Sequence, residues 1–430
     1  MCRFRGSAKR TKAGVSCISW FLLALTTIGC RPARQSPLDA DAHQYVRLAV
    51  ALGERDPDSL DFYAGPADAV ADIRRSPPPL TAIKREAEGL ATRIRARHGA
   101  DPVERIRAAA LVRDLAALVA RVDLLSGVRL GYDQESVSFF GIAPGPIDEP
   151  GPDAIRSRIA ALTGGGGRLV DRYAAFAARF TIPPERLQAV MGAALDACRR
   201  ATLAQVALPT GEHATLEFVH DRPWSAFSRY LGGARSVIQV NADFRFTIDQ
   251  ALQIACHEGY PGHHTRNTLR TSINGGERAE RSVQLTFSPE SLASEASAML
   301  AAEIAFSPDE RMRVERDRLF PLANLAPAGA AAHLEVEQLA GELQPVQADV
   351  ARRYLDGQLE FARAVAELEE RALVPHAEAQ IKYINEFRSY VTTYTTGRTT
   401  FAARLRACEG AAPVARELQW RCFQHESLIP

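Results

Sequence analysis

The sequence predicts a mainly α-helical protein, made of multi-helix bundles with a small β-sheet beside one histidine-bearing helix. With 430 residues, 46% hydrophobic and 24% charged, the chain has the length and balance of one large globular domain or two ordinary ones. It is rich in Ala and Arg and poor in aromatic residues, which favours helix. Lys plus Arg number 52 against 51 Asp plus Glu, so the charge predicts no nucleic-acid partner.

Residues 1–29 predict an export signal. A basic start precedes an apolar run from Val15 to Ile28, which is short for a bilayer span but suits a secretory signal. The end of this run, up to Cys30, resembles the lipobox of bacterial lipoproteins. That resemblance implies lipid on Cys30 and a protein anchored in the membrane, facing the periplasm or the cell exterior. A plain signal peptide and a retained anchor helix are the alternatives. Residues 30–42 predict a flexible tether.

The cysteines fall into two groups, those of the predicted export segment and those of the rest of the chain. Beyond the signal and Cys30, the chain keeps Cys198, Cys256, Cys408 and Cys422, which export would place in an oxidising compartment. Their spacing matches no zinc–cysteine site. For Cys408 and Cys422, a disulfide and a pair of buried free thiols both fit the sequence.

Residues 43–205 predict an N-terminal helical region. Asp101-Pro102 is a typical helix start, and the segment that follows to about Leu125 carries one broad apolar stripe. The Gly- and Pro-rich stretch 131–151 predicts a loop. The Gly164–Gly167 run lacks the strand and Lys-Ser/Thr of a nucleotide loop, so it predicts a flexible connection. Further amphipathic helices are expected at 79–98, 152–162, 167–180 and 184–204.

Residues 206–430 predict the region that holds the small sheet. Strands are expected at 215–219, 236–240 and 283–287, and the strand 236–240 is a candidate edge for an extended peptide. Thr247 begins a helix, with Gln250 completing a capping box, and this helix runs directly into His257. Helices are expected again after residue 287, including a long stretch from about 333 to 373.

The strongest chemical signal is the run from His257 to His264, whose sequence is His-Glu-Gly-Tyr-Pro-Gly-His-His. It begins like the zinc-binding His-Glu-x-x-His helix, in which histidines four apart share a face. Here Pro261 occupies the second histidine's place. A straight helix would put His264 on the face of His257 but about 10 Å along the axis, whereas a bulge at Pro261-Gly262 would bring His263 back. The spacing therefore predicts a second ligand without deciding between them; histidines beside a surface turn are the alternative.

A third ligand is expected from the helix 289–306. Glu295 is the only acid between Ser291 and Ala302, and an acid on a buried face needs a paired charge, which a metal supplies. Glu290 and Glu303 are expected to be solvated, and an exposed Glu295 is the alternative. Together these residues predict one zinc ion with an open position for water, and another divalent ion in its place is the alternative.

These motifs resemble the bacterial domain-of-unknown-function family numbered 885, regarded as relatives of the gluzincin metallopeptidases. The flanking segments Asp56–Pro66 and Tyr394–Gly397 also resemble it. The resemblance implies a mostly helical zinc metallopeptidase. It further implies zinc ligation by His257, His263 and Glu295, Glu258 as general base, and His264 as a neighbour of the ligands. The chain departs from the family pattern at Glu295-Ala296-Ser297, where Glu-Gly-Trp is common, and is shorter than many members.

The expected reaction is hydrolysis of a peptide substrate by zinc-activated water, with Glu258 moving the proton. Tyr394 is the first candidate for stabilising the oxyanion, followed by Tyr390, Arg388 and His220. Two other functions stay open. One is a zinc amidase or esterase acting on cell-wall fragments or another non-peptide substrate. The other is a non-catalytic surface lipoprotein with a vestigial or purely structural metal site.

Overall fold

The computed structural model describes residues 36–97, 101–144, 150–222, 224–272, 278–410 and 414–429. The predicted signal, Cys30 and most of the predicted tether lie outside these ranges. Residues Pro37–Pro430 form one unit, and its first helix, α1 (Asp39–Arg55), begins inside the segment 30–42 that was expected to be a tether. No helix within the described ranges combines the length and the hydropathy required to traverse a bilayer.

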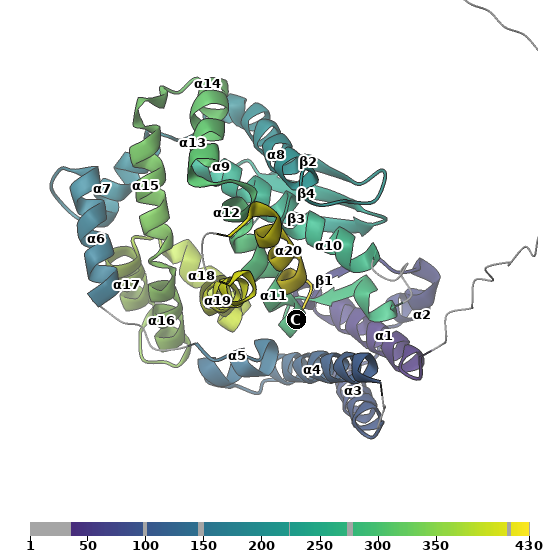
Figure 1. Ribbon diagram of the computed structural model, residues 1–430. Helices are drawn as coiled ribbons and strands as arrows, with labels where there is room; N and C mark the ends of the chain where they lie inside the picture. Colours follow the sequence, from purple (N-terminus) through teal and green to yellow (C-terminus); the bar gives the residue numbers. More distant parts are fainter. Residues whose placement is uncertain are drawn as a thin grey trace, which may run out of the picture. The chain divides into compact units, whose positions relative to one another are not determined.

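The mainly α-helical class is confirmed, and the first helices form one bundle (Figure 1). The chain leads from α1 through β1 (Leu60–Tyr63) and α2 (Ala71–Arg75) to α3 (Leu80–Arg95) and α4 (Pro102–Leu125). The predicted start of α4 is confirmed, because the Asp101 side chain accepts a hydrogen bond from the backbone of Val103 at 2.9 Å. The apolar faces of α1, α3 and α4 pack on one another and on Val283 and Leu285, so a distant strand closes this core.

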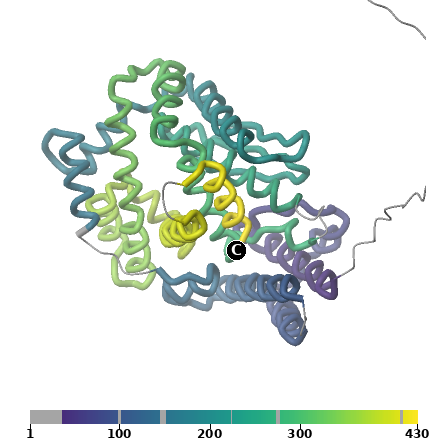
Figure 2. The backbone as a smooth tube through the Cα atoms, viewed as in Figure 1, coloured from purple at the N-terminus to yellow at the C-terminus, as the bar shows by residue number. Residues whose placement is uncertain are grey.

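The stretch 131–151 was wrongly predicted as a loop, since it contains α5 (Tyr132–Phe140). Gly141 at φ +72° ends this helix in the left-handed conformation that glycine adopts freely. A second group of helices follows along the chain (Figure 2). The helical stretch expected from about 333 to 373 consists of three helices. These elements are α6 (Pro150–Thr163), α7 (Leu169–Ala178), α8 (Leu187–Leu203), α13 (Pro308–Val314), α14 (Phe320–Leu322), α15 (Ala330–Gly341), α16 (Gln344–Leu355) and α17 (Phe361–Ala372).

The small sheet has the strand order β2-β4-β3, with β2 (His213–Val219) parallel and β3 (Ala226–Gly232) antiparallel to β4 (Arg235–Asn241). The strands expected at 215–219 and 236–240 are confirmed, whereas β3 was not predicted. Because β4 is central and paired on both sides, the expectation that this strand offers a free edge is wrong. The edge strands of this sheet are β2 and β3. The third expected strand is β5 (Val283–Leu285), which pairs with β1.

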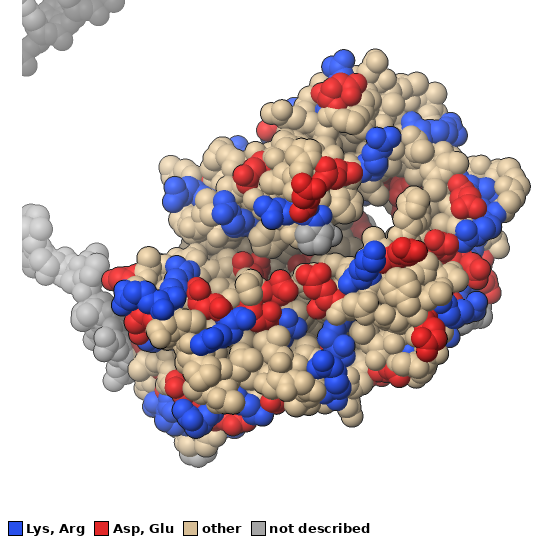
Figure 3. Space-filling view, turned by 180° about the vertical axis from the view of Figure 1, so that it is seen from behind, with Lys and Arg blue, Asp and Glu red and all other residues tan. Residues whose placement is uncertain are grey.

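One helical segment carries the histidine motif through the middle of the unit. α9 (Ile248–Ile254) begins with the predicted capping box and continues as the π-helical turn η4 (Ala255–Gly259), after which α10 (His263–Ser272) begins. α11 (Pro289–Met299) and α12 (Ala301–Ala305) replace the single helix expected at 289–306. Viewed from behind, the surface is hollowed between its upper and lower halves, and acidic side chains gather beside the hollow (Figure 3). The remaining helices are α18 (Glu378–Phe387), α19 (Arg398–Glu409) and α20 (Arg416–Ser427).

Candidate metal centre

The bend between the two halves of the histidine motif brings His263 back to His257. The π-helical turn η4 widens the helix at His257, and the Gly262 N–H then donates to the Cys256 carbonyl at 3.0 Å. Only glycine fits there, because a Cβ on Gly262 would lie 1.8 Å from the carbonyl oxygen of His257. As a result, the Nε2 atoms of His257 and His263 are 3.1 Å apart.

Glu295 on α11 completes a triangle with the two imidazoles. Its Oε2 lies 3.3 Å from His257 Nε2, and its Oε1 lies 3.5 Å from His263 Nε2. Two ligands that each sit about 2.0 Å from a tetrahedral zinc ion are about 3.3 Å apart. The three observed separations, 3.1, 3.3 and 3.5 Å, bracket that value. The three atoms therefore have the spacing of ligands around one small cation.

Two further observations fit a cation at this point. Glu295 Oε2 is buried and has no hydrogen-bond partner among the described residues, which is costly for a carboxylate oxygen unless a charge compensates it. The other imidazole nitrogen of His263, Nδ1, lies 3.0 Å from Ser294 Oγ, which orients the ring. The donor set of two histidines and one carboxylate is also one that zinc accepts in catalytic sites.

The pKa values of His263 and Glu295 also fit a cation at this point. Burial disfavours the charged form of His263, but attraction to Glu295 outweighs burial and raises the pKa of His263 to about 9. Burial likewise opposes ionisation of Glu295, but His263 and His257 together hold the pKa of Glu295 far below its usual range. The carboxylate thus draws a proton onto the neighbouring imidazole, which is the place where a metal would bind.

His264 lies apart from this group. It is fully buried beside β4, where its Nδ1 contacts Ser236 Oγ at 2.8 Å and its Nε2 contacts Glu212 Oε2 at 3.1 Å. Both ring nitrogens are therefore occupied elsewhere. Of the two histidines between which the spacing could not decide, His263 faces Glu295 and His264 does not. Tyr260 also donates to Glu212, at 2.7 Å, so the motif's remaining polar groups tie it to the sheet.

Glu258 lines the same cavity as the three predicted ligands. Glu258 is 8% exposed, and burial is the main reason why its pKa is raised above the usual range. A buried carboxylate that lies next to a metal position and has a raised pKa has the properties of a general base. The predicted base and the predicted ligands are thus brought together in one cavity.

The cavity has a volume of about 290 Å³, and one of its walls is aromatic. Tyr390 donates to Glu295 Oε1 at 3.0 Å, so it helps to hold that carboxylate. Tyr394 also lines the cavity, and its hydroxyl contacts the Tyr383 hydroxyl at 3.4 Å. The other two oxyanion candidates are placed elsewhere: Arg388 pairs with the buried Glu135 at 2.6 Å, and His220 pairs with Asp243 on the surface at 2.6 Å.

The two remaining acids of the 289–306 segment behave differently. Glu303 is exposed, as expected, and pairs with Arg398 at 2.7 Å. Glu290 was expected to be solvated, and this is wrong. It is 8% exposed, contacts Arg266, and lies 2.9 Å from Arg270 Nε, so two guanidinium groups compensate its burial.

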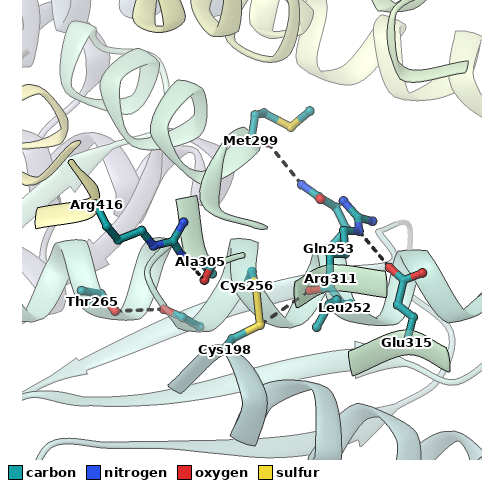
Figure 4. Close-up of a disulfide and its surroundings, with 11 residues drawn as sticks. Cys198, Leu252, Gln253, Cys256, Thr265, Met299, Ala305, Arg311, Glu315 and Arg416 are labelled. Atoms are coloured by element: carbon teal, nitrogen blue, oxygen red, sulfur yellow. Dashed lines mark hydrogen bonds and ion pairs between the residues drawn. A yellow bond between two sulfur atoms is a disulfide. The ribbon is translucent and has the colours of Figure 1, made fainter. Parts of the chain in front are cut away.

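Two disulfides form within the described part of the chain, and one of them ends beside His257. Cys198 of α8 is bonded to Cys256, the residue before His257 (Figure 4). The second bridge joins Cys408 to Cys422. The second pairing was one of two outcomes compatible with the sequence. The first was not predicted, although four cysteines in an oxidising compartment are a signal for two bridges.

Residues outside the histidine motif also line the cavity, and sequence reasoning assigned them no role. Asp58 and Asp61 come from the segment around β1, and Trp224, Phe227 and Ser228 come from the segment around β3. The available signal was the Asp56–Pro66 segment, which stands out as a motif without a function of its own.

No family model matches this chain, and no curated protein matches it, so membership of the family numbered 885 stays a prediction. Two solved structures are distantly similar. A candidate lipoprotein from Colwellia psychrerythraea is 14% identical with a TM-score of 0.46, over 90% of this chain and 74% of that chain. A candidate lipoprotein of unknown function from Shewanella oneidensis is 13% identical with a TM-score of 0.45, over 90% and 82%. Similarities this remote carry no argument about the function of this chain.

Proposed function

We propose that this protein is a zinc-dependent peptidase. The observation that supports this most is the convergence of His257, His263 and Glu295 at tetrahedral ligand spacing, with Glu258 in the same cavity. A purely structural zinc site closes its coordination with four protein ligands and has no use for a neighbouring base. Three ligands beside an open cavity leave a position for water and substrate.

The residues divide the chemistry as follows. Zinc, when bound, supplies Lewis-acid chemistry that activates water and polarises a carbonyl group. Glu258 takes one proton from the attacking water and passes it to the leaving amine as the peptide C–N bond breaks. Tyr390 is engaged with Glu295 and so orients that carboxylate, whereas the Tyr394 hydroxyl has only the long contact to Tyr383. Tyr394 is therefore the better donor to the developing oxyanion.

The edge of the sheet supports a peptide as the substrate. Ala226, Phe227 and Ser228 of β3 line the cavity, and β3 pairs with β4 on one side only within its sheet. An extended chain can add to such an edge through backbone hydrogen bonds. A zinc amidase or esterase would use the same metal chemistry but would not need this edge.

The test is a comparison of the purified protein with its Glu258→Gln variant. Both proteins should contain about one zinc per chain by mass spectrometry, because Glu258 is not a ligand. Hydrolysis of a mixed peptide library should fall by at least about 100-fold in the variant, as expected for loss of general-base catalysis. Undiminished peptide hydrolysis in the variant would refute the mechanism. Equal activity on ester and non-peptide amide substrates would favour the amidase or esterase.

We also propose that the protein is exported and anchored through lipid on Cys30. The two disulfides among the described residues fit an oxidising compartment. Mass spectrometry of the N-terminal peptide from membranes should find a lipidated Cys30, and Cys30→Ser should release the protein into the soluble fraction. A soluble wild-type protein with an unmodified Cys30 would contradict the anchor.

A further inference from the structure

Apart from the two histidines and the tyrosines, the ionisable side chains that line the cavity beside the metal centre are carboxylates. Among the described residues five carboxylates line it and no Lys or Arg does. A divalent cation would offset two of these negative charges, belonging to Glu258 and Glu295. Asp58, Asp61 and Glu386 remain, and none of them forms an ion pair with Lys or Arg within the described part of the chain. Such a cavity attracts a positively charged group.

Asp61 is the member of this set that the fold holds in place. Gln284 Nε2 donates to Asp61 Oδ2 at 2.6 Å, while Gln284 Oε1 accepts from Arg266 Nη1 at 3.2 Å. Gln284 and Arg266 are both 2% exposed, so the amide has one favourable orientation, with its NH2 group toward Asp61. Asp61 Oδ1 makes no hydrogen bond within the described ranges. The result is a pre-oriented carboxylate with one oxygen left to accept from a ligand.

The size and the walls of the cavity limit what this ligand is. The volume of about 290 Å³ is at the lower end of the range for small-molecule pockets, which suits the end of a peptide better than its middle. Trp224, Tyr383 and Phe387 contribute rings to the lining, and aromatic faces attract organic cations. A primary ammonium group on a short peptide satisfies the charge, the size and the aromatic surface together.

We propose that Asp61 binds the free α-ammonium group of a short peptide whose first peptide bond lies at the metal centre. The protein would then act on peptides from their amino end. This inference rests on the proposed peptidase function and adds a substrate class to it. Asp61 is here a specificity-determining residue, and Gln284 is a positioning residue that acts through it.

An ammonium group can come from the amino terminus or from a lysine side chain, and three substrates separate these sources. They are trialanine, N-acetyl-trialanine, and N-acetyl-lysyl-alanyl-alanine. With the zinc-loaded wild-type protein, kcat/KM for trialanine should exceed that for N-acetyl-trialanine by at least about 30-fold, which is typical for loss of a buried charge pair. The lysine peptide should be as poor as N-acetyl-trialanine. If it is cleaved as well as trialanine, the proposed α-amino recognition is wrong.

The Asp61→Asn variant tests the residue itself. It should lose at least about 30-fold in kcat/KM for trialanine and change by less than about threefold for N-acetyl-trialanine, because only the first substrate carries the partner charge. Asp68→Asn is the matched control, since Asp68 is an exposed acid near the same strand and does not line the cavity. It should keep the full preference. An unchanged preference in Asp61→Asn overturns the proposal.

Binding separates a failure of this proposal from a failure of the proposed function. Calorimetric titration of the Glu258→Gln protein with trialanine and N-acetyl-trialanine measures amine recognition without turnover. Preference for the free amine in a protein that hydrolyses nothing would keep Asp61 as an ammonium site and reject the peptidase. Hydrolysis with equal binding of both peptides would keep the peptidase and reject the role of Asp61.

Discussion

Two clusters of histidine and acid lie toward opposite ends of one helical segment, residues 248–259, and they have opposite surroundings. Asp249, in the first turn of α9, lies with His333 and Glu337 of α15, whereas His257, in η4, lies with His263 and Glu295. Both clusters contain one residue of that segment, a histidine and a glutamate. The two sets differ in composition, because the first has two acids and one histidine and the second has two histidines and one acid. They also differ in spacing and access.

The spacing differs in a way that favours a cation at only one end. His333 Nε2 lies 2.8 Å from Asp249 Oδ1, which is ion-pair contact and closer than two ligands of one tetrahedral ion. One oxygen of each acid in this cluster also has a local donor, since Thr247 donates to Asp249 Oδ1 at 2.6 Å and Tyr173 donates to Glu337 Oε2 at 2.9 Å. Glu337 Oε1 has no hydrogen-bond partner among the described residues. At the His257 end, the separations are those of ligands.

Access differs as well. His333 has no exposed surface and stacks on the Phe180 ring, with the ring centres 4.1 Å apart. His257 and His263 line a cavity that Glu258 also lines. We interpret the Asp249 cluster as a contact between α9 and α15 that supports the helical segment, and the His257 cluster as the proposed metal centre. A set of ligand-like side chains can serve a hydrolase only when it is both spaced for an ion and open to a substrate.

Removing one glutamate from each cluster tests most directly which of the two binds a metal ion. Loss of a residue that only orients a metal ligand lowers metal affinity by up to roughly 100-fold. Glu295 is a proposed ligand, so Glu295→Gln should lower zinc affinity by more than this, and activity should be lost together with the metal. Glu337→Gln should keep about one zinc per chain and full activity, since its cluster binds no ion. Zinc content after dialysis is the measurement. Two equivalents in the wild type and one in Glu337→Gln would show that both ends bind metal.

The next largest effect concerns the Asp249 cluster and the free energy of unfolding. His333→Ala should lower the free energy of unfolding by about 3–5 kcal/mol, because Asp249 would stay buried without the imidazole that it contacts. The matched control is His220→Ala. His220 contacts Asp243 at 2.6 Å, a distance similar to that of the buried pair, but its side chain is 64% exposed. Surface pairs contribute about 0–1 kcal/mol, so this variant should unfold nearly as the wild type does in urea. Equal losses in the two variants would remove burial as the explanation.

The two disulfides sharpen the comparison at the metal end. The Cys198–Cys256 bridge closes a loop with a sequence separation of 58 and ends beside His257, whereas Cys408–Cys422 closes one of 14. The chain-entropy model predicts a loss of about 4 kcal/mol for the first bridge and about 3 kcal/mol for the second when both cysteines become Ala. Zinc affinity should fall only in the Cys198→Ala/Cys256→Ala protein. If both double variants bind zinc equally well, the bridge does not position His257.

The sequence predicted the parts of this picture that depend on local patterns. Helix class, the Asp101 cap, the capping box at Thr247 and the strands at 215–219 and 236–240 all arise from neighbouring residues and were confirmed. For Glu295, the helix face could be read from the spacing of apolar residues, because one buried acid among small residues needs a partner. The structure places it against both imidazoles.

The parts that could not be predicted depend on contacts between distant residues. Whether His263 or His264 turns toward Glu295 is decided by the π-helical turn and by Glu212, which precedes β2 and contacts the His264 ring. The sequence of β3 shows no strong alternation of apolar and polar residues. This strand forms because it pairs with the edge of β4. Asp61 reaches the cavity only because β1 pairs with β5, across more than half of the chain.

The smallest expected effect is a dependence of folding stability on pH that arises from Glu337 in the Asp249 cluster. Burial, followed by the negative charge of Asp249, raises the pKa of Glu337 to about 8, whereas an unfolded glutamic acid titrates near 4.3. Between these values the folded protein holds a proton that the unfolded chain releases. Folding stability should therefore be highest below the unfolded pKa, fall as the pH rises, and level off above about 8.

The slope attributable to Glu337 is at most about 1.4 kcal/mol per pH unit, and the Glu337→Gln variant should lack it. Urea unfolding of both proteins between pH 5.5 and 8 isolates this contribution, because all other groups titrate equally in the two and cancel in the difference. The free energy of unfolding of the variant, relative to that of the wild type, should increase steadily as the pH rises. Parallel stability curves would mean that Glu337 is already ionised in the folded protein. The cluster would then carry an uncompensated negative charge, and a cation at this end of the segment would become the better explanation.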